Sequence, residues 1–150
     1  MNYRETMSRL NNALNNIDLA YTVIAKKHGL TFNALMMVCL IDEKKNVTQK
    51  QICDALHLPK STVHSILLDF INLEYIMFMI GSNKKEKIVV FTTKGVKHFF
   101  KVLEETRLFE DRVLAILGDD VCAVLVETAE NLGQIIKQEI AGLCGNEVSN

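Results

Sequence analysis

Two short segments hold the residues whose types and spacing could support chemistry. The first carries hydroxyl, imidazole and ammonium groups at helical spacing, with one leucine among them: Lys60, Ser61, Thr62, His64, Ser65 and Leu68. The second carries an amide and three ammonium groups: Asn83, Lys84, Lys85 and Lys87. These polar groups hydrogen-bond to base edges and phosphate oxygens, and a leucine can contact a thymine methyl group. Both segments are therefore candidates for DNA contact, although a solvated helix, a polar hairpin tip and a packed leucine would show the same residues.

The distribution of charge favours this chemistry more than the total charge does. The formal net charge is −1, which alone argues against a nucleic-acid binder. Between Lys44 and Lys101, however, ten lysines and four acidic residues give a net charge of +6, and the rest of the chain carries −7. A basic middle with acidic ends is typical of local contact with a polyanion. It is equally typical of lysines that only solvate a surface.

Catalytic and metal-binding motifs are missing from the sequence. There is no glycine-rich phosphate loop, GxSxG or HExxH motif, and Asp119-Asp120 fits a helix cap better than an acid pair. The four cysteines and four histidines lack CxxC or zinc-ligand spacing. We therefore predict that the protein is not an enzyme, binds no metal or cofactor, and keeps its cysteines as reduced structural thiols. A metal site assembled across a subunit boundary is the alternative for the metal. An oxidation switch at Cys122 or Cys144 is the alternative, but no basic residue closely flanks either thiol.

Composition predicts one folded unit without a membrane segment. The chain has 150 residues, of which 49% are hydrophobic, so a substantial core is expected. The longest apolar run, residues 34–41, is far shorter than the ~18 residues of a membrane span. The polar start of the sequence lacks the apolar region of a signal peptide. We expect a cytoplasmic protein with no membrane partner.

The elements that must position the two segments can be predicted from hydrophobic periodicity. Apolar residues near the 3.6-residue period predict helices over residues 5–27, 32–42, 48–56 and 60–73. Thr48 and Gln51 have the types and spacing of a capping box at the start of the third helix. In the fourth helix the apolar stripe lies opposite Ser61, Ser65 and Leu68.

The period changes after the fourth helix. Residues 75–81 and 87–93 are rich in aromatic and β-branched residues, which predicts two strands joined by a polar hairpin tip. A long helix is expected to about residue 117, Gly118 breaks it, and a last helix continues to about residue 143. The predicted fold class is mainly α (α+β): a winged helix-turn-helix with flanking N- and C-terminal helices.

This order and spacing resemble the MarR family of bacterial transcription regulators over nearly the whole chain. The segment VTQKQICDALHLPKSTVHSILLDFINLEYI is similar to the family's helix-turn-helix pattern, and FTTKG after the wing is similar to its L-T-x-K-G. The residues on or near pattern positions are Thr48, Ile52, Cys53, Leu56, Leu58, Ser61, Thr62, Val63, Ile66 and Leu67.

The resemblance implies one MarR-like subunit over residues 1–150, with a winged helix at 31–93 and dimerisation helices at 1–28 and 94–145. The implied activity is that of a repressor that binds a palindromic operator in double-stranded DNA as a homodimer. The fourth helix would enter a major groove and the wing a minor groove. A small aromatic or apolar ligand, bound in a pocket of the protein, would cause it to release the DNA. In this sequence the pocket would involve Tyr21, His28, Phe32 and Met36. These four residues could equally be simple core.

The sequence departs from the family pattern at three places. Asn83 and Lys85 stand where the wing often has aspartate and arginine, so the planar guanidinium fork is lost. All four arginines lie outside the winged helix. His57 stands where glycine is common, and histidine tolerates a positive φ better than most residues. Because the total charge is near neutral and the fourth helix has no arginine, a winged-helix protein-interaction module without DNA binding remains the alternative function.

Overall fold

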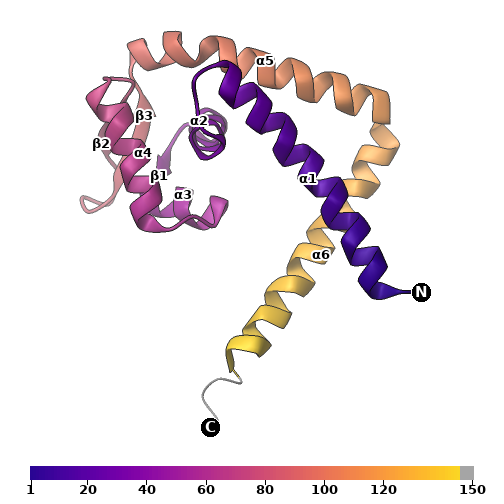
Figure 1. The fold of residues 1–150 in the computed structure, drawn as a ribbon. Helices are drawn as coiled ribbons and strands as arrows, with labels where there is room; N and C mark the ends of the chain where they lie inside the picture. The colour runs from indigo at the N-terminus through magenta and orange to yellow at the C-terminus, as the bar shows by residue number, and fades with distance from the viewer. Residues whose placement is uncertain (146–150) are drawn as a thin grey trace. The chain divides into compact units, whose positions relative to one another are not determined.

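A computed structural model describes residues 1–145 of the chain (Figure 1). In chain order its elements are α1 (Tyr3–Lys27), α2 (Phe32–Lys44), β1 (Val47–Thr48), α3 (Gln49–Leu56), α4 (Lys60–Asn72), β2 (Ile76–Ile80), β3 (Lys87–Phe91), α5 (Thr93–Leu117) and α6 (Asp119–Gly145). Two compact units are present, one over residues 1–107 and one from Leu108 onward. The predicted mainly α fold with a winged helix-turn-helix is confirmed.

Side-chain caps define where the first helices begin. Asn2 Oδ1 accepts from the Glu5 amide at 3.2 Å, and Thr31 Oγ1 accepts from the Ala34 amide at 3.1 Å. At α3 the predicted capping box is present: Thr48 Oγ1 accepts from the Gln51 amide at 3.2 Å, and Gln51 Oε1 accepts from the Thr48 amide at 2.9 Å. These bonds satisfy amides that a helix start would otherwise leave without partners.

The turn between α3 and α4 and the start of α6 depend on local backbone conformation. His57 ends α3 in the left-handed region at φ 51°, which confirms the conformation expected for this glycine-like position. Gly118, at φ +90°, separates α5 from α6. Asp119 and Asp120 lie in the first turn of α6 rather than at its cap, where negative charge favours the helix dipole.

The sheet has one strand more than the sequence predicted. Its order is β1-β3-β2, with both pairings antiparallel. In β3, Val89 pairs with Phe78 of β2 on one side and with Val47 of β1 on the other. Periodicity could not reveal β1, because a strand of two residues is too short to show alternation. Its pairing joins the base of the wing to the segment that opens α3.

The core of the first unit lies between the helices and the wing. Val63, Leu67 and Phe70 on α4 are buried, as the predicted apolar stripe requires. The ring of Phe99 on α5 meets that of Phe70 edge-on, with 5.1 Å between their centroids. Figure 1 shows α2, α3 and α4 gathered beside the hairpin of β2 and β3.

Several long helices keep large apolar side chains at the surface of the single chain. On α1 these are Tyr3, Met7, Leu14, Ile17, Leu19 and Val23, and on α6 they are Val121, Val124, Leu125, Val126, Ile135, Ile136, Ile140 and Leu143. Within the described residues no single helix is both long and apolar enough to span a membrane; the bent pair α1 and α2 meets that test by length and composition only.

Candidate nucleic-acid interface

The outer face of α4 carries most of the helix residues that the sequence singled out. Ser61, His64 and Ser65 are exposed, and Leu68 is 45% exposed although the adjacent Leu67 is only 1% exposed. Thr62 is half-buried. The buried stripe on the opposite side fixes the rotation of α4, so this polar face points away from the core. The arrangement presents two hydroxyls and an imidazole along one side of a helix.

The first backbone amides of α4 are not capped by a side chain and can donate hydrogen bonds to an external acceptor. The N-cap residue is Pro59, and no side chain caps the helix. The Val63 amide donates to the Pro59 carbonyl at 3.2 Å, which closes the first turn but leaves the amides ahead of Val63 pointing outward. Uncapped amides and the positive end of the helix dipole favour an anion at this end of α4.

The wing tip is built by its own backbone and by Asn83. The Gly81 amide donates to the Glu86 carbonyl at 2.9 Å, and the Glu86 amide donates to the Asn83 carbonyl at 2.8 Å. Asn83 Oδ1 also accepts from the Lys85 amide at 3.4 Å. Asn83 therefore has a local role in shaping the turn, which the sequence did not indicate, and it leaves the neighbouring lysines exposed.

The three wing lysines differ in their surroundings. Lys84 and Lys85 are exposed at the tip. Lys87, at the start of β3, places Nζ 5.7 Å from the centroid of the Phe78 ring, within the range of a cation–π contact. Lys87 is therefore partly held against the sheet, while the two tip lysines are exposed.

A hollow of about 560 Å³ joins these two segments, and we call it the wing hollow. Its lining comes from the segment that opens α3, from α3 itself, from the start of α4 and from the wing: Thr48, Gln49, Lys50, Cys53, Lys60, Lys85, Glu86 and Lys87. The structure thus brings Lys60 together with Lys85 and Lys87, which the sequence placed on separate segments. It adds Gln49 and Lys50, which sequence reasoning missed; their only local signal is that they open α3 directly after its cap.

Charge in the wing hollow is strongly one-sided. Four lysines line it against one acidic residue, Glu86. Within the described part of the chain, no ion pair joins any of these five side chains to another residue. The hollow therefore keeps a positive potential that an external anion can neutralise.

The four residues proposed for an inducer pocket, Tyr21, His28, Phe32 and Met36, are all half-buried. A second cavity of about 400 Å³ is lined by His28 together with Asp69, Tyr75 and His98, among others. The Tyr75 and His98 rings are stacked there, with 3.9 Å between centroids. Burial, followed by the charge of Lys94, lowers the pKa of His98 below the usual histidine value.

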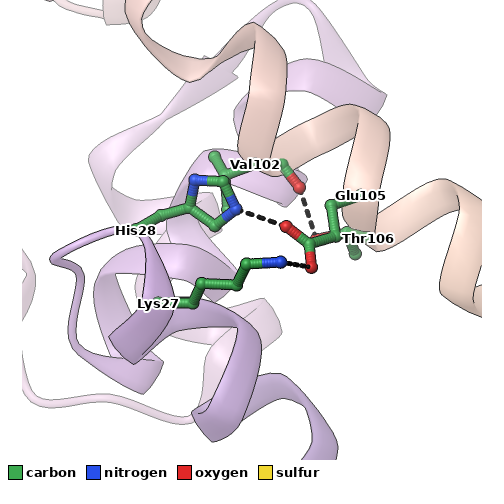
Figure 2. A network of polar contacts seen from close by, with 5 residues as sticks. All are labelled: Lys27, His28, Val102, Glu105 and Thr106. Carbon is green, nitrogen blue, oxygen red and sulfur yellow. Dashed lines mark hydrogen bonds and ion pairs between the residues drawn. The ribbon is translucent and has the colours of Figure 1, made fainter.

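His28 also belongs to a polar junction between the end of α1 and the middle of α5. Figure 2 shows Glu105 between His28 and Lys27: its Oε2 lies 2.6 Å from His28 Nε2, and its Oε1 accepts from Lys27 Nζ at 2.6 Å. The hydrogen bonds from Lys27 and then His28 lower the pKa of Glu105. Nearby, Thr106 donates to the Val102 carbonyl at 2.7 Å. His28 thus has a structural role whether or not a ligand enters the second cavity.

The cysteines and potential metal ligands are dispersed. All four cysteines are free, and Cys144 is exposed. Cys53 is half-buried and lines the wing hollow. The Cys122 thiol lies 3.6 Å from the Leu114 carbonyl oxygen. Among the described residues, no cluster of three histidine, cysteine, aspartate or glutamate side chains is arranged to hold a metal ion.

Comparison with known proteins connects this geometry to one fold. Residues 33–77 match the family model of the IclR helix-turn-helix domain. No curated protein matches the sequence significantly. Among solved structures, a MarR family regulator from Neisseria meningitidis superposes with a TM-score of 0.80 at 21% identity, covering 94% of this chain and 98% of that one.

Two further similar structures were solved with bound molecules. A MarR family protein from Listeria monocytogenes, in complex with a 26mer DNA, has a TM-score of 0.71 at 16% identity and covers 89% of each chain. Staphylococcus aureus MarR, in complex with salicylate and kanamycin, has a TM-score of 0.71 at 16% identity and covers 91% of this chain and 93% of that one. The chain therefore has the fold of MarR regulators, as the sequence resemblance predicted.

Proposed function

We propose that the protein is a sequence-specific DNA-binding regulator of transcription, acting as a repressor, with no enzymatic activity. The observation that carries the proposal is that the exposed polar face of α4 and the wing lysines adjoin one positively charged hollow. In this arrangement Ser61, His64 and Ser65 face base edges in a major groove, and Lys84 and Lys85 reach the neighbouring backbone or minor groove. The DNA complex of the Listeria relative supports this assignment.

The proposed active species is a homodimer. Helix α6 exposes Leu125 at 55%, Ile135 at 56% and Leu143 at 71% in the single chain, far more apolar surface than one helix normally leaves in water. We assign residues 1–28 and 94–145 to dimerisation and residues 31–93 to DNA binding. Two copies of α4 would then face two half-sites of a palindromic operator, one helical turn apart or a multiple of it.

A small apolar or aromatic ligand is proposed to control DNA binding. The second cavity offers the apolar Phe70 and Leu73 beside the polar His28 and His98. The salicylate complex of the Staphylococcus relative supports this class of ligand. Of the four residues predicted for the pocket, His28 is the one in the lining of this cavity, and the proposal for Tyr21, Phe32 and Met36 rests on the fold alone. The proposed compartment is the cytoplasm, where such a regulator meets DNA.

The test is an electrophoretic mobility shift of the DNA upstream of the protein's own coding region, titrated at several salt concentrations against a duplex of scrambled sequence. We expect retardation of the upstream duplex to be sequence-selective and to weaken steeply as salt rises. Because α4 lacks an arginine for bidentate contact with guanine, a protein-interaction module is the second candidate. Failure to retard any duplex at low salt would favour that module.

A further inference from the structure

We infer that the wing hollow is a binding site for a phosphate-bearing anion, with Gln49 and Lys50 as binding residues beside Lys60 and the wing lysines. The phosphate can belong to the DNA backbone or to a free phosphorylated ligand. The first source rests on the proposed function and the second does not. Because Lys60, Lys85 and Lys87 also belong to the proposed DNA interface, the two sources compete for the same hollow.

The first observation is an unpaired donor. Nε2 of Gln49 is buried and has no hydrogen-bond partner within the described residues, although its residue lines the hollow. Buried amide groups are nearly always paired, because an unpaired donor loses its bonds to water without replacement. The terminal torsion of glutamine is soft, so the amide can turn toward an acceptor in the hollow. An oxygen of a bound anion would supply that acceptor.

The second observation is that two helices begin at the hollow. Gln49 and Lys50 are the first two residues of α3, and Lys60 is the first residue of α4. The capping box satisfies the Gln51 amide but not the two amides before it. No side chain caps α4. Both helix ends therefore add outward amides and positive dipole ends to the same space, the combination that favours phosphate.

The third observation concerns charge and size. The four lysines have no ion-pair partner in the described part of the chain, and Glu86 offsets only one of their four charges, so a dianion would supply ion pairs that the lysines lack. A phosphate group offers several oxygens to donors that converge from α3, α4 and the wing, whereas a carboxylate offers only two. A volume of about 560 Å³ exceeds that of one phosphate and accommodates an attached sugar or a second phosphate.

The first arm of the test uses inorganic pyrophosphate and the full chain without DNA, measured by calorimetry at constant ionic strength. Gln49→Glu places a carboxylate at the donor, and Gln49→Leu removes the donor without adding charge. Both changes are expected to weaken pyrophosphate binding about tenfold, the usual loss for a hydrogen bond to a charged group. Lys50→Ala should weaken it too. Lys101→Ala on α5, an exposed lysine outside the hollow, is the matched control and should leave binding within twofold, as roughly expected for a distant surface charge.

The second arm identifies the DNA source. A duplex that the wild type retards is prepared with single neutral methylphosphonate linkages, scanned along each half-site. If a backbone phosphate occupies the hollow, a methylphosphonate at one position per half-site should weaken wild-type binding about tenfold. The same linkage should weaken Gln49→Leu binding no more than about twofold, because the variant has already lost that contact. In addition, pyrophosphate should release the duplex from the wild type at concentrations that leave Gln49→Leu bound.

The outcomes separate this inference from the proposed function. If pyrophosphate binding depends on Gln49 but no duplex binds at any salt concentration, the wing hollow is a site for a free phosphorylated ligand. The proposed function as a DNA-binding regulator is then overturned. If the protein binds a duplex, no single methylphosphonate linkage weakens that binding more than the others, and pyrophosphate does not bind, then the phosphate site is overturned. The proposed function as a DNA-binding regulator is unaffected by that result. The inference is also overturned if folded Gln49→Glu and Gln49→Leu bind pyrophosphate as tightly as the wild type and the methylphosphonate scan is identical in all variants.

Discussion

Gly95 lies so close to Tyr75 that a β-carbon built on the glycine would stand 1.9 Å from the Tyr75 carbonyl oxygen. Thr92 completes this contact: its amide donates to the same carbonyl at 3.0 Å, and its hydroxyl donates to the Glu74 carbonyl at 2.6 Å while accepting from the Gly95 amide at 3.0 Å. The threonine and glycine of FTTKG therefore join the start of α5 to the segment that opens the wing. This contact holds the wing at a set position beside α4.

We predict that Gly95→Ala destabilises the protein by about 1–3 kcal/mol, the cost of forcing extra atoms into a packed site. The clash is with backbone, which cannot rotate away as a side chain can. Urea unfolding followed by circular dichroism measures the change. Gly133→Ala on α6 is the control, because a β-carbon there meets nothing within 4 Å. If Gly95→Ala lowers the free energy of unfolding no more than Gly133→Ala does, the close contact between Gly95 and Tyr75 would be contradicted.

Leu67 and Leu68 are adjacent in α4 and should respond oppositely to alanine. Leu67→Ala removes a side chain that is 1% exposed and should cost about 2–5 kcal/mol of stability. Leu68→Ala should change stability by no more than about 0.5 kcal/mol, as for most surface positions. If Leu68 contacts a thymine methyl, replacing that thymine with uracil should weaken wild-type binding roughly fourfold and leave the variant unaffected. Equal uracil sensitivity in both proteins would instead show that Leu68 does not contact the thymine methyl group.

Lys85→Ala should weaken binding to every duplex by a similar factor and lower the slope of log affinity against log salt by about one unit. The reason is that one fewer phosphate is neutralised and one fewer counterion is released. Fluorescence anisotropy at four or more salt concentrations gives the slope. Lys101→Ala, away from the wing, should keep the wild-type slope; a slope for Lys85→Ala equal to that of this control would remove Lys85 from the interface.

Acid should weaken the junction around Glu105 over a defined pH range. Its folded pKa lies below the ordinary 4.5, owing to the hydrogen bonds from Lys27 and then His28. Its stabilising contribution is therefore fully present above pH 4.5 and is lost as the pH falls through the lowered folded pKa. We expect Glu105→Gln to be less stable than the wild type at neutral pH, and we expect this difference in stability to shrink below pH 4.5. Urea titrations at a series of pH values measure this difference, and a Glu105→Gln curve that runs parallel to the wild-type curve would refute the assignment.

The local structure of this protein could be predicted from its sequence because the signals act over a few residues. The capping box of Thr48 and Gln51 and the left-handed His57 were confirmed, since both depend on neighbours within one helical turn. The stripe that buries Val63 and Leu67 also determined which side of α4 remains outside. From these features followed the winged fold and the candidate face of α4.

The tertiary structure alone decided what lies next to that face. Lys50 and Lys60 open two different helices and Lys85 lies at the wing tip, yet pairing of β1 with β3 and packing of α3 on α4 bring them around one hollow. Likewise, nothing near Gly95 in the sequence indicates that the Tyr75 carbonyl fills the space of its missing side chain. Such neighbours arise only when distant segments are brought together by sheet register and core packing, and short-range periodicity carries no information about either.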